Sequence, residues 1–306
     1  MKVAISTLHC YNNHGGVIQA RCLYRHLTEA GFDCELLDWR ETRKRVRSVL
    51  LRMVARRPVL DGYLNDLRMS PRFLSRTSAG AADHANRQGG ALVVGSDEVW
   101  KFNFIPGRPR AWLFPAVPNV YWGENVTVPR IAYAASAGTS AAEEVPEAER
   151  PRLAALLRGF RLISVRDRHT EGLVKALCPE LNPVLLPDPA FAVPFMEDVD
   201  TSRIRARLGL AEKDRFFALA FDAAPPRVEI PTGWRAADLS RLDVDDWLAA
   251  IKISDHLVTD RMHAMIMGLL AGKTFELVNP RPKLRELADN FGLPTGPMDD
   301  ARRNWP

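Results

Sequence analysis

An arginine and a histidine stand two residues apart where an apolar strand is expected to become an apolar helix. They are Arg261 and His263 in the segment VTDRMHAMIMG, residues 258 to 268. The start of a helix presents unpaired backbone N–H groups and a partial positive charge. Two further cationic or near-cationic side chains add little stability there, whereas they suit the binding of an anion. We therefore predict an anion site at this junction.

These two residue types also suit group-transfer chemistry. A guanidinium such as that of Arg261 can grip a phosphate or a carboxylate at two points. A positioned histidine such as His263 can donate a proton near neutral pH. The structural alternative is that Arg261 pairs with Asp260 or another nearby carboxylate while His263 caps the helix or packs.

Other polar residues end the expected strands of the N-terminal half, where ligands bind in open parallel sheets. Arg166 in ISVRD could reach a ligand, or it could pair with Asp167 or Asp188. Asp97, after Gly95 and Ser96 in VVGSD, could take a proton from a sugar hydroxyl or orient it. Its alternative role is to cap the following turn.

Two small residues and one aromatic residue complete the candidate set. Gly15 and Gly16 precede the first expected helix and would let backbone approach a substrate closely, although a plain tight turn is the alternative. Trp100 could offer an apolar ring face to a sugar, but an aromatic residue after a strand is more often in the core.

The elements that position these residues alternate between strand and helix. Strands are expected at residues 2–8, 33–39, 91–97, 130–138, 162–167, 183–193, 215–221, 255–259 and 274–279. Helices are expected at residues 17–30, 146–160, 168–177, 243–254, 265–271 and 283–291. The alternation predicts an α/β fold of two Rossmann-like, doubly wound domains facing a cleft. Prolines near Pro187 to Pro194 mark the boundary, giving domains 1–190 and 191–306, the second shortened.

The charge is concentrated in one segment of the 306-residue chain, whose net charge is +5. Residues 40–57 carry eight basic residues against Glu41, with apolar residues at helical spacing, which predicts a basic amphipathic helix. A solvated face over a packed stripe is one reading; contact with anionic lipid or a lipid-linked substrate is the other. We do not expect nucleic acid binding, because no aromatic platform accompanies the charge.

The remaining features indicate a cytoplasmic protein. Peripheral contact with the inner face of the membrane is compatible with them. No signal pattern opens the chain, and no apolar run approaches the roughly 20 residues of a membrane helix. The four cysteines lack metal-ligand spacing, so we expect reduced thiols and no metal site.

Six stretches, in order, resemble the polysaccharide pyruvyl transferase family. They are NNHGGVIQARCLYRHLTEAGFDCELLDWR, VVGSDEVW, IAYAASAG, SVRDRHT, LLPDPAF and VTDRMHAMIMGLLAGK, and they span most of the chain. Glu98 stands where the family has Gln, Lys101 where it has Asn, and the region from about residue 222 to 243 is shorter than usual.

The resemblance implies two Rossmann-type domains in the arrangement of the GT-B glycosyltransferases. It also implies transfer of the enolpyruvyl carbons of phosphoenolpyruvate to two hydroxyls of one sugar, which forms a cyclic ketal and releases phosphate. The acceptor is then a saccharide or lipid-linked glycan precursor on the first domain, and the donor binds the second. The scheme needs no cofactor and no metal.

The resemblance also implies roles for individual residues. His263 would be the general acid, and Asp97 would act on the acceptor hydroxyl. The remaining expected contacts are Arg261, Met262 and Arg166 to the donor, and Gly15, Gly16, Ser96 and Trp100 to the acceptor. Two alternatives stay open: a glycosyltransferase-like enzyme with a nucleotide-sugar donor, and a non-catalytic family member that binds a glycan.

Overall fold

The computed structural model describes residues 1–10, 13–42, 60–102, 117–221, 228–280 and 282–290. The chain divides into two compact units, with the first running to Val193 and the second beginning at Pro194. The division falls inside the proline-marked stretch from Pro187 to Pro194.

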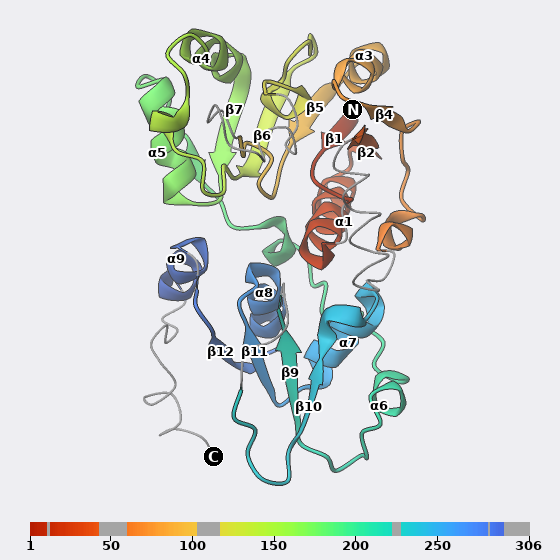
Figure 1. The fold of residues 1–306 in the computed structure, drawn as a ribbon. Helices are drawn as coiled ribbons and strands as arrows, with labels where there is room; N and C mark the ends of the chain where they lie inside the picture. The colour runs from red at the N-terminus through yellow and green to blue at the C-terminus, as the bar shows by residue number, and fades with distance from the viewer. Residues whose placement is uncertain (11–12, 43–59, 103–116, 222–227, 281, 291–306) are drawn as a thin grey trace. The chain divides into compact units, whose positions relative to one another are not determined.

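Unit 1 is built on a six-stranded parallel sheet in the order β2-β1-β5-β6-β7-β8 (Figure 1). Its strands are β1 (Lys2–Ser6), β2 (Asp33–Leu36), β5 (Ala91–Val94), β6 (Arg130–Ala135), β7 (Phe160–Val165) and β8 (Val184–Leu185). Its helices are α1 (His14–Glu29), α3 (Ala79–Gln88), α4 (Arg150–Arg158) and α5 (Arg168–Leu177). Short 3₁₀ turns are η1 (Asp61–Leu64), η3 (Val120–Trp122), η4 (Ala142–Glu144) and η5 (Pro189–Phe191). A separate two-stranded parallel sheet joins β3 (Trp39–Glu41) to β4 (Phe73–Ser75).

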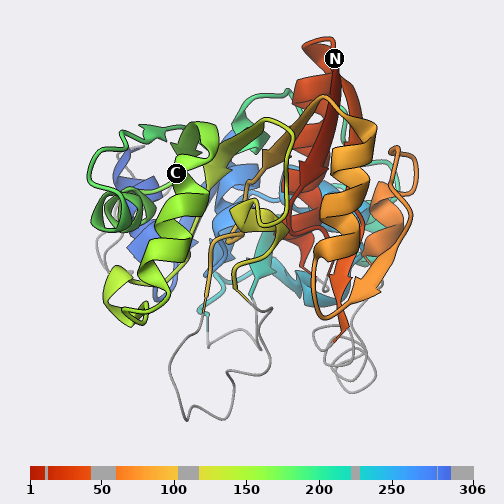
Figure 2. The ribbon, with the colours of Figure 1, turned by 90° about the horizontal axis from the view of Figure 1, so that it is seen from above.

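Helices flank this sheet because its central strands are apolar on both faces (Figure 2). Successive strand side chains point to opposite faces, so Leu92 and Val94 share one face of β5. Both belong to a core that includes residues of α3, α4 and α5, such as Ala82, Leu153 and Leu173. Helix α1 instead contacts β2 and η5.

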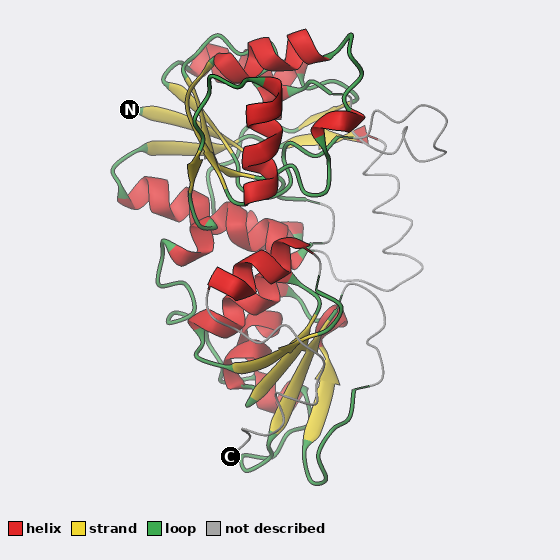
Figure 3. Cartoon of the chain, turned by 90° about the vertical axis from the view of Figure 1, so that its left-hand side faces the viewer, coloured by secondary structure: helices red, strands yellow, loops and turns green. Residues whose placement is uncertain are grey.

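Unit 2 carries a four-stranded parallel sheet in the order β10-β9-β11-β12. The strands are β9 (Phe216–Ala220), β10 (Arg235–Asp238), β11 (His256–Thr259) and β12 (Thr274–Leu277). The helices are α6 (Ile204–Arg207), α7 (Val244–Ile253), α8 (Met262–Leu270) and α9 (Pro282–Asn290), with a 3₁₀ turn η6 (Leu239–Arg241). Figure 3 shows helices packed along one side of these strands. On β9, Phe217 contacts Trp234, at 4.9 Å between ring centroids.

The predicted class, α/β with parallel sheets in two groups, is confirmed, and α5 has the predicted bounds. Several predicted bounds are wrong. Helix α1 begins at His14, so Gly15 and Gly16 lie inside its first turn and not in a loop before it. The strand expected at 33–39 is two strands, β2 and β3, in different sheets. Strand β10 occupies a stretch read as loop, and Glu147 and Glu149 precede α4 and do not form its first turn.

Most of the basic segment 40–57 lies outside the described residues, so its predicted helix stays a prediction. Its first residue is described: Arg40 belongs to β3 and not to a helix. Within the described part of the chain, no helix has both the length and the apolar character needed to cross a membrane.

Gly268 sets how closely α8 packs on its sheet, which gives a first prediction. A Cβ at Gly268 would lie 2.8 Å from Leu257 Cδ2, whereas a Cβ at Gly172, in α5, would meet nothing within 4 Å. Alanine in a helix interior is favoured over glycine by up to about 1 kcal/mol. Overpacking costs about 1–3 kcal/mol. We expect Gly172→Ala to hold or raise the free energy of unfolding in urea and Gly268→Ala to lower it. Equal stabilisation by both would contradict the packing described here.

Candidate functional site

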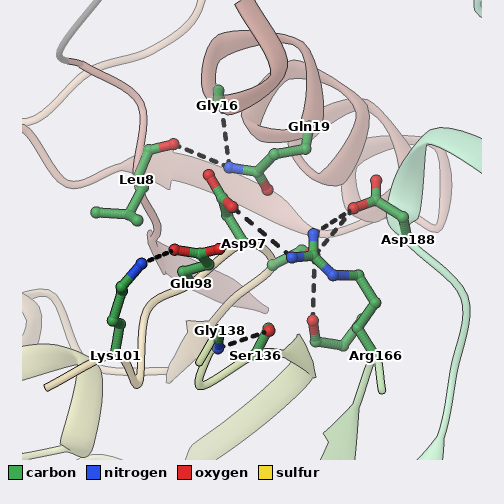
Figure 4. Close-up of polar contacts among 12 residues, drawn as sticks. Leu8, Gly16, Gln19, Asp97, Glu98, Lys101, Ser136, Gly138, Arg166 and Asp188 are labelled. Carbon is green, nitrogen blue, oxygen red and sulfur yellow. Dashed lines mark hydrogen bonds and ion pairs between the residues drawn. The ribbon is translucent and has the colours of Figure 1, made fainter. Parts of the chain in front are cut away.

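Polar residues gather in unit 1 where its parallel strands end (Figure 4). They are Ser96 and Asp97 after β5, Ser136 after β6, Arg166 after β7 and Asp188 at the start of η5. Adjacent parallel strands end at the same edge of a sheet, which brings these residues together although they are far apart in sequence.

The centre of this group is the Arg166 guanidinium, whose side chain is 6% exposed. Its Nη1 donates to Asp188 Oδ2 at 2.8 Å, and its Nη2 lies 3.7 Å from Asp97 Oδ1. Burial lowers the pKa of a guanidinium, but the charges of Asp188 and Asp97 outweigh it and raise the pKa of Arg166. Arg166 is therefore a permanent buried cation held by two carboxylates.

The predicted donor contact of Arg166 stays a prediction, but its side chain has a partner within the unit. The structural alternative, an ion pair with Asp188, is the one observed. Asp167 instead accepts hydrogen bonds from Ser136 Oγ at 2.6 Å and from the Thr170 backbone N–H at 2.7 Å. Two carboxylates beside one guanidinium leave a net negative charge, which opposes a dianionic ligand.

The Asp97 carboxylate has fewer polar contacts than the other charged side chains of the group. Its backbone lies in the left-handed region, with φ 68°, a conformation in which Asp is enriched. Its carbonyl accepts from the N–H groups of Val99 and Ser136. Within the described part of the chain, its carboxylate makes no hydrogen bond and has the 3.7 Å contact with Arg166. The side chain does not cap the turn, so the carboxylate can accept a hydrogen bond from a ligand.

A glycine makes this turn possible. Gly95 has φ 123°, and a Cβ there would lie 2.1 Å from the Tyr133 carbonyl oxygen. Ser96, which follows it, is fully buried. Its Oγ lies 3.1 Å from Ala134 O and 3.3 Å from Asp188 Oδ2. Ser96 thus binds its own chain, and its predicted contact with an acceptor stays a prediction.

Gln19, one turn into α1, is a member of the group that the sequence analysis missed. Its Nε2 donates to Thr7 Oγ1 at 2.8 Å, Leu8 O at 2.9 Å and Gly16 O at 3.0 Å. The residue is fully buried. Its position three residues after Gly16, inside the apolar stripe of a helix, was a signal that could have found it.

Gly16 itself serves packing. A Cβ at Gly16 would approach Leu8 O to 3.1 Å, so the glycine allows α1 to start close to the turn after β1. Gly15 is likewise buried in the first turn of α1. The close approach predicted for these glycines is therefore to the protein's own backbone.

Trp100 takes the structural alternative to its predicted sugar contact. Its side chain is fully buried, and its Nε1 donates to Tyr121 O at 2.8 Å. Its ring packs on Trp122 and Phe160, with centroid distances of 5.6 and 5.8 Å. Trp100 belongs to the core, because the turn after β5 directs the ring inward.

Glu98 and Lys101 form one structural feature. Lys101 Nζ donates to Glu98 Oε2 at 2.7 Å, beside Gly138. The two positions at which the sequence departs from the family pattern are therefore joined as an ion pair, so each departure accommodates the other.

A second buried polar cluster surrounds Asp38, in the segment after β2. Its carboxylate accepts hydrogen bonds from Arg40 Nε at 2.5 Å and Arg72 Nε at 2.9 Å, and His9 Nε2 lies 3.2 Å away. Burial raises the pKa of this carboxyl, but the hydrogen bonds from His9, Arg40 and Arg72 outweigh it and hold the pKa well below its usual range. Arg40 thus has a structural role, as a partner of the buried Asp38.

In unit 2, the predicted anion site lies at the carboxyl end of β11, where α8 begins. Arg261 is the residue before the helix, and its backbone N–H donates to Thr259 Oγ1 at 2.9 Å. Its side chain does not cap the helix, and the first turn holds no acidic residue. By contrast, Asp243 caps α7 by accepting from the Asp246 N–H. The α8 start therefore keeps the electrostatic character that suits an anion.

Met262 and His263, the next two residues, lie in the first turn of α8. Met262 and His263 are 7% and 8% exposed. Because Met262 opens the helix, its backbone N–H and not its apolar side chain is the group suited to an anion. The structure brings Arg261, Met262 and His263 together in one turn, and their roles toward a donor stay predictions.

Two units on parallel sheets, with polar groups at the ends of the strands, define a GT-B-like α/β fold. UDP-GlcNAc 2-epimerase from Neisseria meningitidis, solved bound to UDP-GlcNAc, is similar, with TM-score 0.53 and 8% identity over 94% of this chain and 85% of that one. The enzyme from Methanocaldococcus jannaschii gives TM-score 0.51 and 9% identity over 94% and 87%. These likenesses concern the fold.

The amino-acid sequence identifies the family to which the chain belongs. The polysaccharide pyruvyl transferase family model matches residues 13–275, and the chain belongs to that family. No curated protein matches it by sequence. Membership supports a transferase that modifies a saccharide substrate. The matched range includes the polar groups of both units.

The buried ion pair of Arg166 gives a second prediction. Asp188→Asn keeps the side-chain shape but removes one of the two charges beside Arg166. Breaking a buried pair costs on the order of 3–5 kcal/mol, and the remaining Asp97 should limit the loss to about 2–4 kcal/mol. The matched control is Glu180→Gln, which breaks a pair with Arg158 in which each side chain is 53% exposed. There we expect little loss of unfolding free energy, because water screens an exposed ion pair. Similar losses for both variants in urea titrations would mean that Arg166 does not depend on Asp188.

Proposed function

We propose that the protein transfers the enolpyruvyl group of phosphoenolpyruvate to a saccharide or glycan precursor and forms a pyruvate ketal. The observation that carries this proposal is the start of α8. There Arg261 and His263 lie in one helical turn that has no acidic residue, in a chain of the pyruvyl transferase family. A small anion with phosphate and carboxylate groups matches a guanidinium and a helix N-terminus.

The reaction would run in three steps. His263 donates a proton to the methylene carbon of phosphoenolpyruvate, and the adjacent carbon becomes cation-like. One acceptor hydroxyl attacks that carbon and loses its proton; Asp97 is the proposed group that orients this hydroxyl and takes the proton. Phosphate then leaves with its bonding electron pair. A second hydroxyl of the same sugar attacks the cation-like carbon and loses its proton to the departing phosphate, which closes the ketal. Arg261 and the backbone N–H groups of the first turn of α8 hold the donor's negative charge throughout.

The scheme assigns no step to a cofactor or a metal ion. Two further features belong to the proposal. The acceptor can be lipid-linked, and residues 40–57 can provide peripheral contact with an anionic membrane from the cytoplasmic side.

A nucleotide-sugar donor is the rival that the fold suggests, because one similar structure was solved with UDP-GlcNAc bound. Thermal-shift titration separates the two donors. We expect phosphoenolpyruvate to raise the melting temperature, by an amount corresponding to about 2.7 kcal/mol at a concentration of 100 times Kd. UDP-GlcNAc should have no effect. Stabilisation by UDP-GlcNAc without stabilisation by phosphoenolpyruvate would replace the proposed donor.

Substitutions at Arg261 and His263 should impair different steps: donor binding in the first case and proton transfer in the second. Arg261→Lys keeps the charge but loses the planar two-point grip, so affinity for phosphoenolpyruvate should fall. His263→Gln keeps a hydrogen-bonding side chain but removes the transferable proton. Donor binding should then survive, while the single-turnover rate falls by roughly 10² to 10⁴.

Arg285→Lys is the matched control, because Arg285 lies on the exposed side of α9 in the same unit. It should leave donor affinity and the single-turnover rate unchanged. A fully active His263→Gln variant would remove the acid role from His263.

A further inference from the structure

Three polar groups near the ends of the unit 1 strands have unused hydrogen-bonding capacity. Gln19 Oε1 and Arg166 Nη2 are buried atoms that make no hydrogen bond within the described part of the chain. The Asp97 carboxylate, in the same part of the chain, has the 3.7 Å contact with Arg166 and no hydrogen bond. Figure 4 shows the amide oxygen of Gln19 turned toward the guanidinium of Arg166, with the Asp97 carboxylate beside it.

The orientation of the Gln19 amide is fixed by its surroundings. Its Nε2 faces two carbonyl oxygens, Leu8 O at 2.9 Å and Gly16 O at 3.0 Å. A flipped amide would bring Oε1 against both oxygens, where no hydrogen bond can form. The third contact, Thr7 Oγ1 at 2.8 Å, is also an acceptor toward Gln19, because that hydroxyl donates to Ser96 O at 3.1 Å. Oε1 therefore lies on the side away from Leu8 O and Gly16 O, and Figure 4 shows it turned toward Arg166.

The same contacts join Gln19 to the turn that carries Asp97. The hydrogen bonds run from Gln19 Nε2 to Thr7 Oγ1 and from Thr7 Oγ1 to Ser96 O. Ser96 immediately precedes Asp97 in this turn, where the backbone of Asp97 has φ 68°. Gln19 thus holds its own free acceptor and the turn of Asp97 in one framework.

The chemistry of the missing partner follows from the three groups. Gln19 Oε1 and an ionised Asp97 only accept hydrogen bonds, whereas Arg166 Nη2 only donates. An anion would be opposed by the net negative charge of Asp97, Arg166 and Asp188. A neutral hydroxyl donates and accepts at once, and buried polar groups are rarely left without a partner.

We propose that Gln19, Asp97 and Arg166 form a recognition subsite for two hydroxyls of one saccharide. One hydroxyl donates to Asp97 and accepts from Arg166 Nη2, and the other donates to Gln19 Oε1. This inference rests on the proposed function where it identifies the saccharide as the acceptor. It makes Gln19 a specificity residue and gives Arg166 a role toward the acceptor and not the donor.

The test is a comparison of binding by hydroxyl and deoxy ligands, measured without phosphoenolpyruvate. The probes are the methyl glycosides of glucose, galactose, mannose and N-acetylglucosamine, each with its single-deoxy analogues. In the wild-type protein, removal of the hydroxyl that meets Gln19 should weaken binding roughly tenfold or more. In Gln19→Met, which has similar length but no amide, that particular loss should vanish while the losses at other hydroxyls persist.

Thr7→Val is the control for an indirect effect, because it breaks the link to Ser96 and leaves Gln19 Oε1 in place. It should keep the loss on removal of the Gln19-dependent hydroxyl, even if overall affinity falls. The proposal is overturned if every deoxy penalty is the same in wild type and Gln19→Met, which would indicate a bound water only, or if none of the glycosides binds. Glycoside recognition that depends on Gln19, without pyruvyl transfer, would keep the subsite and reject the proposed function.

Discussion

The buried Arg166 guanidinium is the interaction on which the first unit depends. A permanent cation that is 6% exposed is tolerated only with charged partners, and Asp188 and Asp97 supply them. Each partner belongs to a different segment: Asp188 lies in the chain beyond β8, and Asp97 lies in the turn after β5. The ends of separate strands are thereby brought to one place. The same pairing leaves one negative charge in excess, which disfavours an anionic ligand at this group.

The two units consequently offer opposite chemistry. The polar group of unit 1 repels anions and presents acceptors with one donor, which suits neutral hydroxyls. The start of α8 in unit 2 places Arg261 and His263 at a helix N-terminus that has no acidic residue in its first turn, which suits an anion. An enzyme that joins an anionic donor to a polyhydroxyl acceptor needs both kinds of site. This division supports the proposed transfer more strongly than either site alone.

How much of this could be read from the sequence depended on whether the signal was local. Helix α5 had its predicted bounds because Asp167 caps it and its apolar spacing is regular. The sequence signal that placed Arg261 and His263 at a helix start was also local. Strand β10 was missed because its sequence, RAAD, is a partly exposed edge strand without an apolar run. The pairing of Arg166 with Asp188 and the burial of Trp100 depend on contacts between distant segments, which periodicity does not reveal. Gln19 was overlooked for the same reason, since two of its three partners, Thr7 and Leu8, lie in the segment after β1 and not in its own helix.

The measurement that tests the account most directly is product analysis after incubation with phosphoenolpyruvate and saccharide acceptors. The account predicts release of one phosphate for each saccharide modified. It also predicts a product heavier by one pyruvate less one water, in which two hydroxyls have been consumed. Phosphate release without a ketal, or a product carrying a transferred sugar from a nucleotide-sugar donor, would contradict it.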